Sequence, residues 1–177
     1  MIRSLVLSGA IAVAAVALAV PIARAEPLRL SGAATGSYLA HEGGGGAGLV
    51  LDLGAAFGAV RVGGFTGVAA LLGQESNTRV FLPLGPAIAV RLGAGAVNAS
   101  LGLRAGIWGG ATDTGLAAGG LFGAGARFGY RLGRGASVTV GVDGWLMVGQ
   151  GARWVIAPGV GLQWWPEPDD SLGEAAR

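Results

Sequence analysis

Strict alternation of apolar with polar or small residues is the feature that most constrains what this chain can fold into. In residues 97–108, one set of alternate positions is Val97, Ala99, Leu101, Leu103, Ala105 and Ile107, and the other is Asn98, Ser100, Gly102, Arg104, Gly106 and Trp108. Successive side chains of a β-strand point to opposite faces of the sheet, so the stretch predicts a strand with one apolar face. It is longer than the roughly five or six residues of an ordinary soluble strand and matches the roughly nine to eleven of a membrane-crossing one.

Seven further segments alternate in the same way, which predicts an all-β, eight-stranded antiparallel up-and-down transmembrane barrel. Together with residues 97–108, the eight segments are residues 28–39, 49–57, 60–72, 79–92, 97–108, 116–132, 136–148 and 154–165. Polar or glycine-rich joints at 41–48, 73–78, 109–115 and 149–153 alternate with tight joints near 58–59, 93–96 and 133–135. Alternating joint lengths and an even strand number are typical of bacterial outer-membrane barrels, whose short turns face the periplasm. Both chain ends would then be periplasmic.

Two other architectures conflict with the pattern. A helical membrane protein needs about 18 or more consecutive apolar residues, and after the N-terminal leader every comparable window holds charges or several glycines. A soluble eight-stranded barrel places its apolar residues inside. Here the apolar face is the larger one, and turning it to water would expose far more than the few hundred Å² that soluble monomers tolerate. Lipid outside and a polar lumen inside is the consistent arrangement.

Composition agrees with one exported domain. The chain is 52% hydrophobic and 12% charged, with 36 glycines and no cysteine. Two of the 12 basic residues, Arg3 and Arg24, lie in the leader, so the remainder carries ten basic residues against ten acidic ones. There is no basic block with interleaved aromatics, so nucleic-acid binding is not expected.

The chain divides into a leader, a barrel and a short tail. Residues 1–25 have a basic start, an apolar run and the small-x-small sequence Ala23-Arg24-Ala25, which together predict a signal peptide cleaved after Ala25. Residues 26–166 form the predicted outer-membrane barrel. Residues 167–177 are acidic and predict a disordered periplasmic extension.

With this pattern over residues 28–165, the chain resembles the small eight-stranded outer-membrane barrels, the OmpA/OmpX-like and opacity-type proteins. Such proteins carry an assembly signal in the last strand, with hydrophobic or aromatic residues three and five positions after a glycine. Gly159, Leu162 and Trp164 stand in that arrangement, although Ala157 replaces the usual polar residue and the chain continues past the strand. Trp164 is equally explained as an aromatic anchor at the membrane interface. The resemblance implies contact with outer-membrane lipid and lipopolysaccharide, and with the barrel-assembly machinery during insertion.

The inward charges suggest an ion network. Asp52, Arg104, Arg127 and Asp143 lie several residues from their nearest tight turns, so we expect them to meet near the membrane midplane, where pairing offsets the cost of burial. The alternative is a narrow, anion-favouring pore, because many other inward positions are glycine or alanine. A second group of arginines is expected towards the periplasmic rim as a solvated or salt-bridged end: Arg29, Arg61, Arg91, Arg131 and Arg134.

Catalysis has little support in the sequence. Some outer-membrane barrels modify lipids with a serine, a histidine and an acid, but the single histidine, His41, and Ser76 fall in different joints. The glycine run at 43–48 is followed by a strand, so it offers no helix N-terminus to a phosphate. No metal-ligating cluster and no cofactor motif is present. We therefore expect a monomeric, non-enzymatic barrel with a structural or surface-interaction role, with a lipid-modifying enzyme as a lesser alternative.

Overall fold

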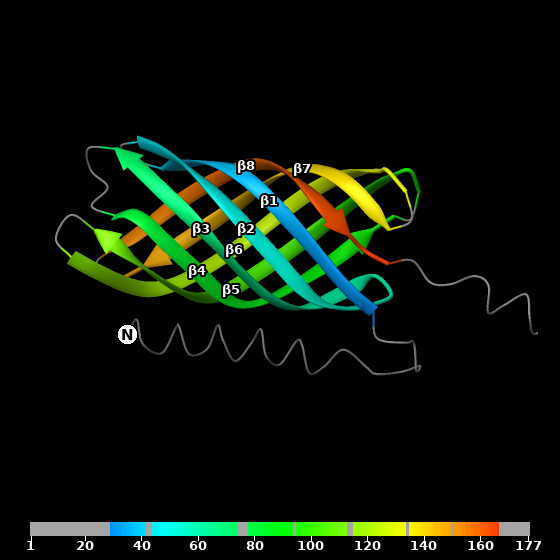
Figure 1. Ribbon diagram of the computed structural model, residues 1–177, viewed down its shortest axis with the longest axis horizontal. Coiled ribbons are helices and arrows are strands. Elements are labelled where there is room, and N and C mark those ends of the chain that lie inside the picture. Colours follow the sequence, from blue (N-terminus) through cyan, green and yellow to red (C-terminus); the bar gives the residue numbers. More distant parts are fainter. Residues whose placement is uncertain are drawn as a thin grey trace, which may run out of the picture.

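The computed structural model describes residues 29–41, 44–73, 78–93, 95–112, 115–133, 135–149 and 151–166. Within these ranges the chain forms one closed barrel in which each strand pairs antiparallel with its sequence neighbours and β1 pairs with β8 (Figure 1). The strands are β1 (Arg29–His41), β2 (Gly44–Phe57), β3 (Val60–Gly73), β4 (Thr78–Leu92), β5 (Val97–Thr112), β6 (Gly115–Arg131), β7 (Ala136–Val148) and β8 (Ala152–Trp164). The predicted eight-stranded up-and-down barrel is confirmed.

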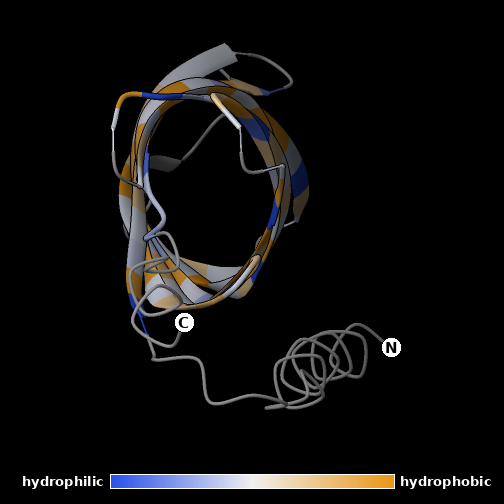
Figure 2. Ribbon diagram, turned by 90° about the vertical axis from the view of Figure 1, so that its right-hand side faces the viewer, coloured by the Kyte–Doolittle hydropathy of each residue, from blue (hydrophilic) through white to orange (hydrophobic). Residues whose placement is uncertain are grey.

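The strands close into a ring (Figure 2), and the outer face of this ring is apolar all the way round. Leu30, Leu103 and Trp154 are 71%, 53% and 69% exposed, and they belong to a belt of leucine, valine, isoleucine and aromatic side chains contributed by every strand. No charged side chain that the structure describes within the strands is exposed. Alternation therefore keeps the described charges of the strands off the outer face, which carries large apolar side chains. Among the described residues, no helix is long and apolar enough to cross a membrane.

Three tight connections lie at one end of the barrel, which we call the short-turn end. They comprise residues 58–59, 93–96 and 132–135, where the sequence predicts its tight joints. Each contains a glycine with a positive φ: Gly58 at 56°, Gly93 at 82° and Gly135 at 77°. Residues with a Cβ rarely adopt a positive φ, whereas glycine does so readily and allows the chain to reverse direction. β1 begins and β8 ends at this same end, on the right of Figure 1.

The connections at the opposite end, which we call the loop end, are shorter than the sequence predicts. Only residues 42–43, 74–77, 113–114 and 149–151 separate the strands there, so the expected contrast between long and short connections is wrong. Much of the predicted loop sequence belongs to strands instead: residues 44–48 pair with β3, and residues 109–112 pair with β6. Glycine allows this close pairing, because a Cβ on Gly46 would collide with the carbonyl oxygen of Ala70.

Candidate functional site

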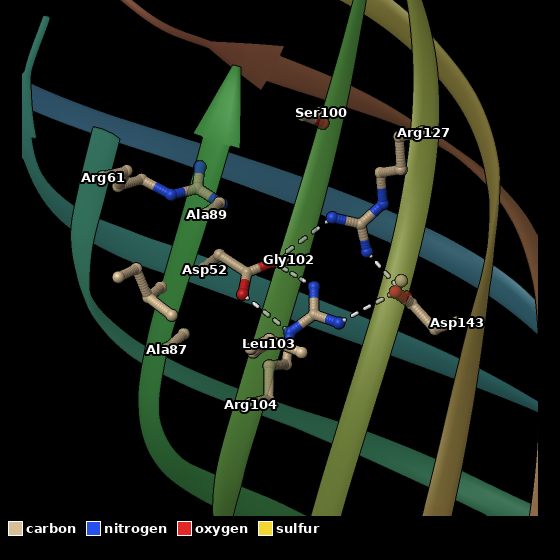
Figure 3. Close-up of a pocket in the computed structure, with 12 residues that line it drawn as sticks. Asp52, Arg61, Ala87, Ala89, Ser100, Gly102, Leu103, Arg104, Arg127 and Asp143 are labelled. Atoms are coloured by element: carbon tan, nitrogen blue, oxygen red, sulfur yellow. Dashed lines mark hydrogen bonds and ion pairs between the residues drawn. The ribbon is translucent and has the colours of Figure 1, made fainter. Parts of the chain in front are cut away.

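The middle of the lumen is crossed by four charged side chains from β2, β5, β6 and β7. Figure 3 shows the guanidinium of Arg104 between the carboxylates of Asp52 and Asp143. Arg104 donates from Nε to Asp52 Oδ1 at 2.9 Å and from Nη2 to Asp52 Oδ2 at 2.8 Å, and its Nη1 donates to Asp143 Oδ1 at 3.0 Å. A bidentate arginine–carboxylate pair is both stronger and more directional than a single ionic contact.

Arg127 completes the ring of charges. Its Nη2 donates to Asp143 Oδ2 at 2.7 Å, and its Nη1 lies 3.7 Å from Asp52 Oδ2. Arg104 and Arg127 thus alternate with Asp52 and Asp143, and all four are at most 9% exposed. Taking such charges out of water costs several kcal/mol per ion, which close pairing and hydrogen bonding offset. We call these four residues the ion network; the structure brings together all the residues that the sequence places in it.

Small residues on the adjacent strands make room for the ion network. Gly125 pairs with Asp143, and Gly141 pairs with Arg127. A Cβ on Gly125 would collide with the Asp143 carboxylate, and one on Gly141 would lie 2.6 Å from Arg127 Cγ. The inward glycines therefore leave space for the long charged side chains that cross the lumen.

Arg61 lies deeper than the solvated rim position expected from the sequence. It is 5% exposed, and it lines the same cavity as the ion network. Its guanidinium carbon lies 5.4 Å from the centroid of the Trp165 ring, an arrangement that favours a cation–π interaction. No carboxylate of the described residues lies within ion-pair distance of Arg61, and its Nη1 is buried without a hydrogen-bond partner there.

Trp165 covers this end of the lumen. The residue follows β8 and is 2% exposed. Its indole Nε1 donates to the carbonyl oxygen of Gly58 at 3.0 Å, and its backbone N donates to that of Gly135 at 2.8 Å. Trp165 therefore links the turn between β2 and β3 to the turn between β6 and β7. The sequence pattern places this residue in the last strand but does not indicate its closing role.

The other rim arginines have different surroundings. Arg29, Arg91 and Arg131 are partly buried near the short-turn end, at the start of β1 and the ends of β4 and β6. Arg134 lies outside the described residues, as do the predicted signal peptide and the acidic tail. In β8, Leu162 and Trp164 of the predicted assembly signal are 60% and 53% exposed on the outer face, whereas Gly159 packs against Gly36 and Ser37 of β1.

An apolar cluster fills the lumen between the ion network and the loop end. Phe81 of β4 contacts Trp108 and Trp145 edge to face, with ring centroids 6.4 and 6.3 Å apart. We call this cluster the apolar plug; its other large members are Leu39, Val50, Phe65, Leu71, Leu121, Met147 and Val155. Alternation does not indicate the plug, because β3 carries apolar residues on both faces, with Phe65 and Leu71 turned inward.

A small cavity lies beside the ion network. The cavity beside the ion network has a volume of about 10 Å³, roughly what one water molecule needs. Its lining includes Asp52, Arg61, Ser100, Arg104 and Arg127. The ion network therefore lies between the apolar plug on one side and Trp165 on the other.

Features that would support catalysis or metal binding do not come together in the described part of the chain. His41 ends β1, whereas Ser76 lies outside the described residues. No group of three or more histidine or acidic side chains within the described ranges is arranged to hold a metal ion.

Comparison with known proteins identifies the fold. No protein-family model matches the sequence, and no curated protein matches it. Among solved structures, the chain is similar to Neisserial surface protein A (NspA), with a TM-score of 0.64 and 11% identity over 78% of this chain and 99% of that one. It is also similar to the N-terminal β-barrel domain of Pseudomonas aeruginosa OprF, with a TM-score of 0.51 and 12% identity over 77% of this chain and 99% of that one. The chain therefore has the fold of the small eight-stranded outer-membrane β-barrels.

Proposed function

We propose that the protein is an integral outer-membrane β-barrel with a structural or surface-interaction role and no catalytic one. The observation that carries this proposal is the apolar, uncharged outer face of the described strands. An apolar belt surrounds the ring without an exposed charge among the described strand residues, whereas the ion network lies inside. In water such a belt would greatly exceed the apolar patches of soluble monomers, whereas hydrocarbon accommodates it. Closure of the sheet pairs the strand edges, as hydrocarbon requires.

The fold also supports an orientation and a set of partners. Both ends of the described barrel lie at the short-turn end, which we place in the periplasm together with the acidic tail. The outer belt would contact outer-membrane lipid and lipopolysaccharide. Leu162 and Trp164 are exposed on the outer face of β8, where the barrel-assembly machinery could bind them during insertion. The predicted signal peptide, residues 1–25, would direct export before its cleavage after Ala25.

The closed lumen favours this role over an anion-favouring pore. The apolar plug lies on the loop-end side of the ion network, and Trp165 lies on the other side. The short connections at the loop end provide little surface beyond the strands, which favours a structural role over a large adhesive one. We infer a monomer, because closure of the sheet leaves no strand edge for a second copy to pair with.

Separation of bacterial membranes tests the proposal. The full chain, expressed in a Gram-negative host, is expected to sediment with the outer membrane on a sucrose density gradient and to remain there after a high-salt wash. Recovery in the inner-membrane or the soluble fraction would contradict it.

A further inference from the structure

The lumen holds one more buried positive charge than buried negative charge around a single cavity. Arg61, Arg104 and Arg127 line it together with Asp52 and Asp143, and all five side chains are at most 9% exposed. The carboxylate oxygens of the two aspartates are engaged by Arg104 and Arg127. Arg61 is therefore the cation whose charge these carboxylates do not balance by direct contact.

Arg61 has a hydrogen-bond donor for which its surroundings supply no acceptor. Its Nη1 is buried and has no hydrogen-bond partner in the described part of the chain. The ring of Trp165 covers the guanidinium but cannot accept a strong in-plane hydrogen bond from it. A buried guanidinium is costly unless its charge and its N–H groups are satisfied. Arg61 thus lines a cavity in which no acceptor of the described residues lies within hydrogen-bond distance of its Nη1.

We propose that this cavity binds a monatomic halide ion, chloride under physiological conditions, with Arg61 as its principal ligand. Its volume of about 10 Å³ leaves room for one small particle and favours a monatomic anion over larger polyatomic ones such as phosphate. One monovalent anion makes the five-charge cluster neutral. The inference is independent of the membrane location, because it concerns only the interior of the barrel.

Crystallography with bromide tests the site directly. The full chain, folded in detergent and crystallised in sodium bromide, should show an anomalous peak beside Arg61 Nη1 in the cavity. Arg61→Gln should remove the peak, whereas Arg91→Gln should retain it, because Arg91 carries the same charge near the same end but does not line the cavity. Only water in the wild-type cavity, with no anomalous signal, would overturn the proposal.

Unfolding in solution gives a second test that does not depend on crystals. Urea unfolding in detergent is compared in sodium chloride and in sodium gluconate of equal ionic strength, because gluconate is too large for the cavity. At chloride concentrations far above the dissociation constant, each tenfold increase in chloride should raise the ratio of folded to unfolded protein about tenfold. Arg61→Gln should abolish the difference between the salts, and Arg91→Gln should preserve it. Equal stability of the wild type in both salts would overturn the proposal. So would loss of the difference between the salts in Arg91→Gln as well as in Arg61→Gln.

Discussion

The carboxylate of Asp143 occupies the space that a side chain at position 125 would need. Gly125 pairs with Asp143 across β6 and β7, and a Cβ there would collide with Asp143 Oδ1, the atom that accepts from Arg104 Nη1. The geometry of the ion network thus depends on a residue that carries no charge. Glycine at position 125 is therefore needed for the space it leaves, not for flexibility.

Gly125→Ala should break the Arg104–Asp143 contact and lower the free energy of unfolding by about 1–3 kcal/mol, the cost of leaving buried polar groups unsatisfied. Gly102→Ala is the matched control. Gly102 pairs directly with Gly125, but a Cβ there would meet nothing nearer than 3.7 Å, so little loss is expected. Urea unfolding in detergent measures both variants. Equal effects would show that the carboxylate is not held as described.

Asp52 and Arg104 should be strongly coupled in stability. Asp52→Asn removes the charge that receives two hydrogen bonds from Arg104, and breaking a buried pair in this way costs about 3–5 kcal/mol. Combining it with Arg104→Met should cost less than the sum of the two single changes, because each residue needs the other. A double-mutant cycle measures the coupling. Combining Asp52→Asn with a change at the exposed Trp154 is the control, because the losses in free energy of unfolding should simply add there. If the losses of Asp52→Asn and Arg104→Met also simply add, the ion network is contradicted.

The free-energy cost of a charge on the outer face should depend on its depth in the membrane. Leu103 lies at the middle of β5, beside Arg104 but on the opposite face, and Val97 lies on the same outer face where β5 begins. Leu103→Arg should cost about 2–4 kcal/mol in a bilayer, whereas Val97→Arg should cost about 0–1 kcal/mol. Unfolding from lipid vesicles measures the difference. Equal costs at both positions would contradict the assignment of this face to lipid.

The lumen should not conduct ions. The wild-type protein in a planar bilayer is expected to give no conductance steps, because the apolar plug fills the loop-end half of the interior. Trp165→Ala removes the cover at the short-turn end but leaves the plug, so this variant should also give no conductance steps. Regular steps from the wild type would restore the pore alternative; steps from Trp165→Ala alone would show that the plug does not seal.

Alternation in the sequence was sufficient to predict most of the barrel. The segment at 136–148 matches β7 in full, and the tight turns fall where glycine permits a positive φ. The pattern predicts a loop for the glycine-rich residues 44–48, because they carry too few large apolar side chains to show alternation. Their pairing with β3 depends on closure of the whole sheet, which no local pattern records.

The interior was less predictable than the wall. Period two places Asp52 and Arg104 on inward faces at similar heights, but which donor meets which acceptor depends on the stagger between distant strands. Phe65 and Leu71 are inward members of the apolar plug. When both faces of a strand carry apolar residues, the sequence pattern does not distinguish the lumen face from the lipid face. Burial of Arg61 beneath Trp165 likewise depends on a contact between residues more than a hundred positions apart in the chain.

The most direct test of a lipid-embedded closed barrel is its migration on a detergent gel before and after heating. Protein folded into lipid vesicles and loaded without boiling should run as a compact band, because the paired ring of strands survives the detergent at room temperature. Boiling should convert it completely to a band of different mobility at the position of the unfolded chain. Identical migration with and without boiling, from protein that has bound the vesicles, would contradict the account.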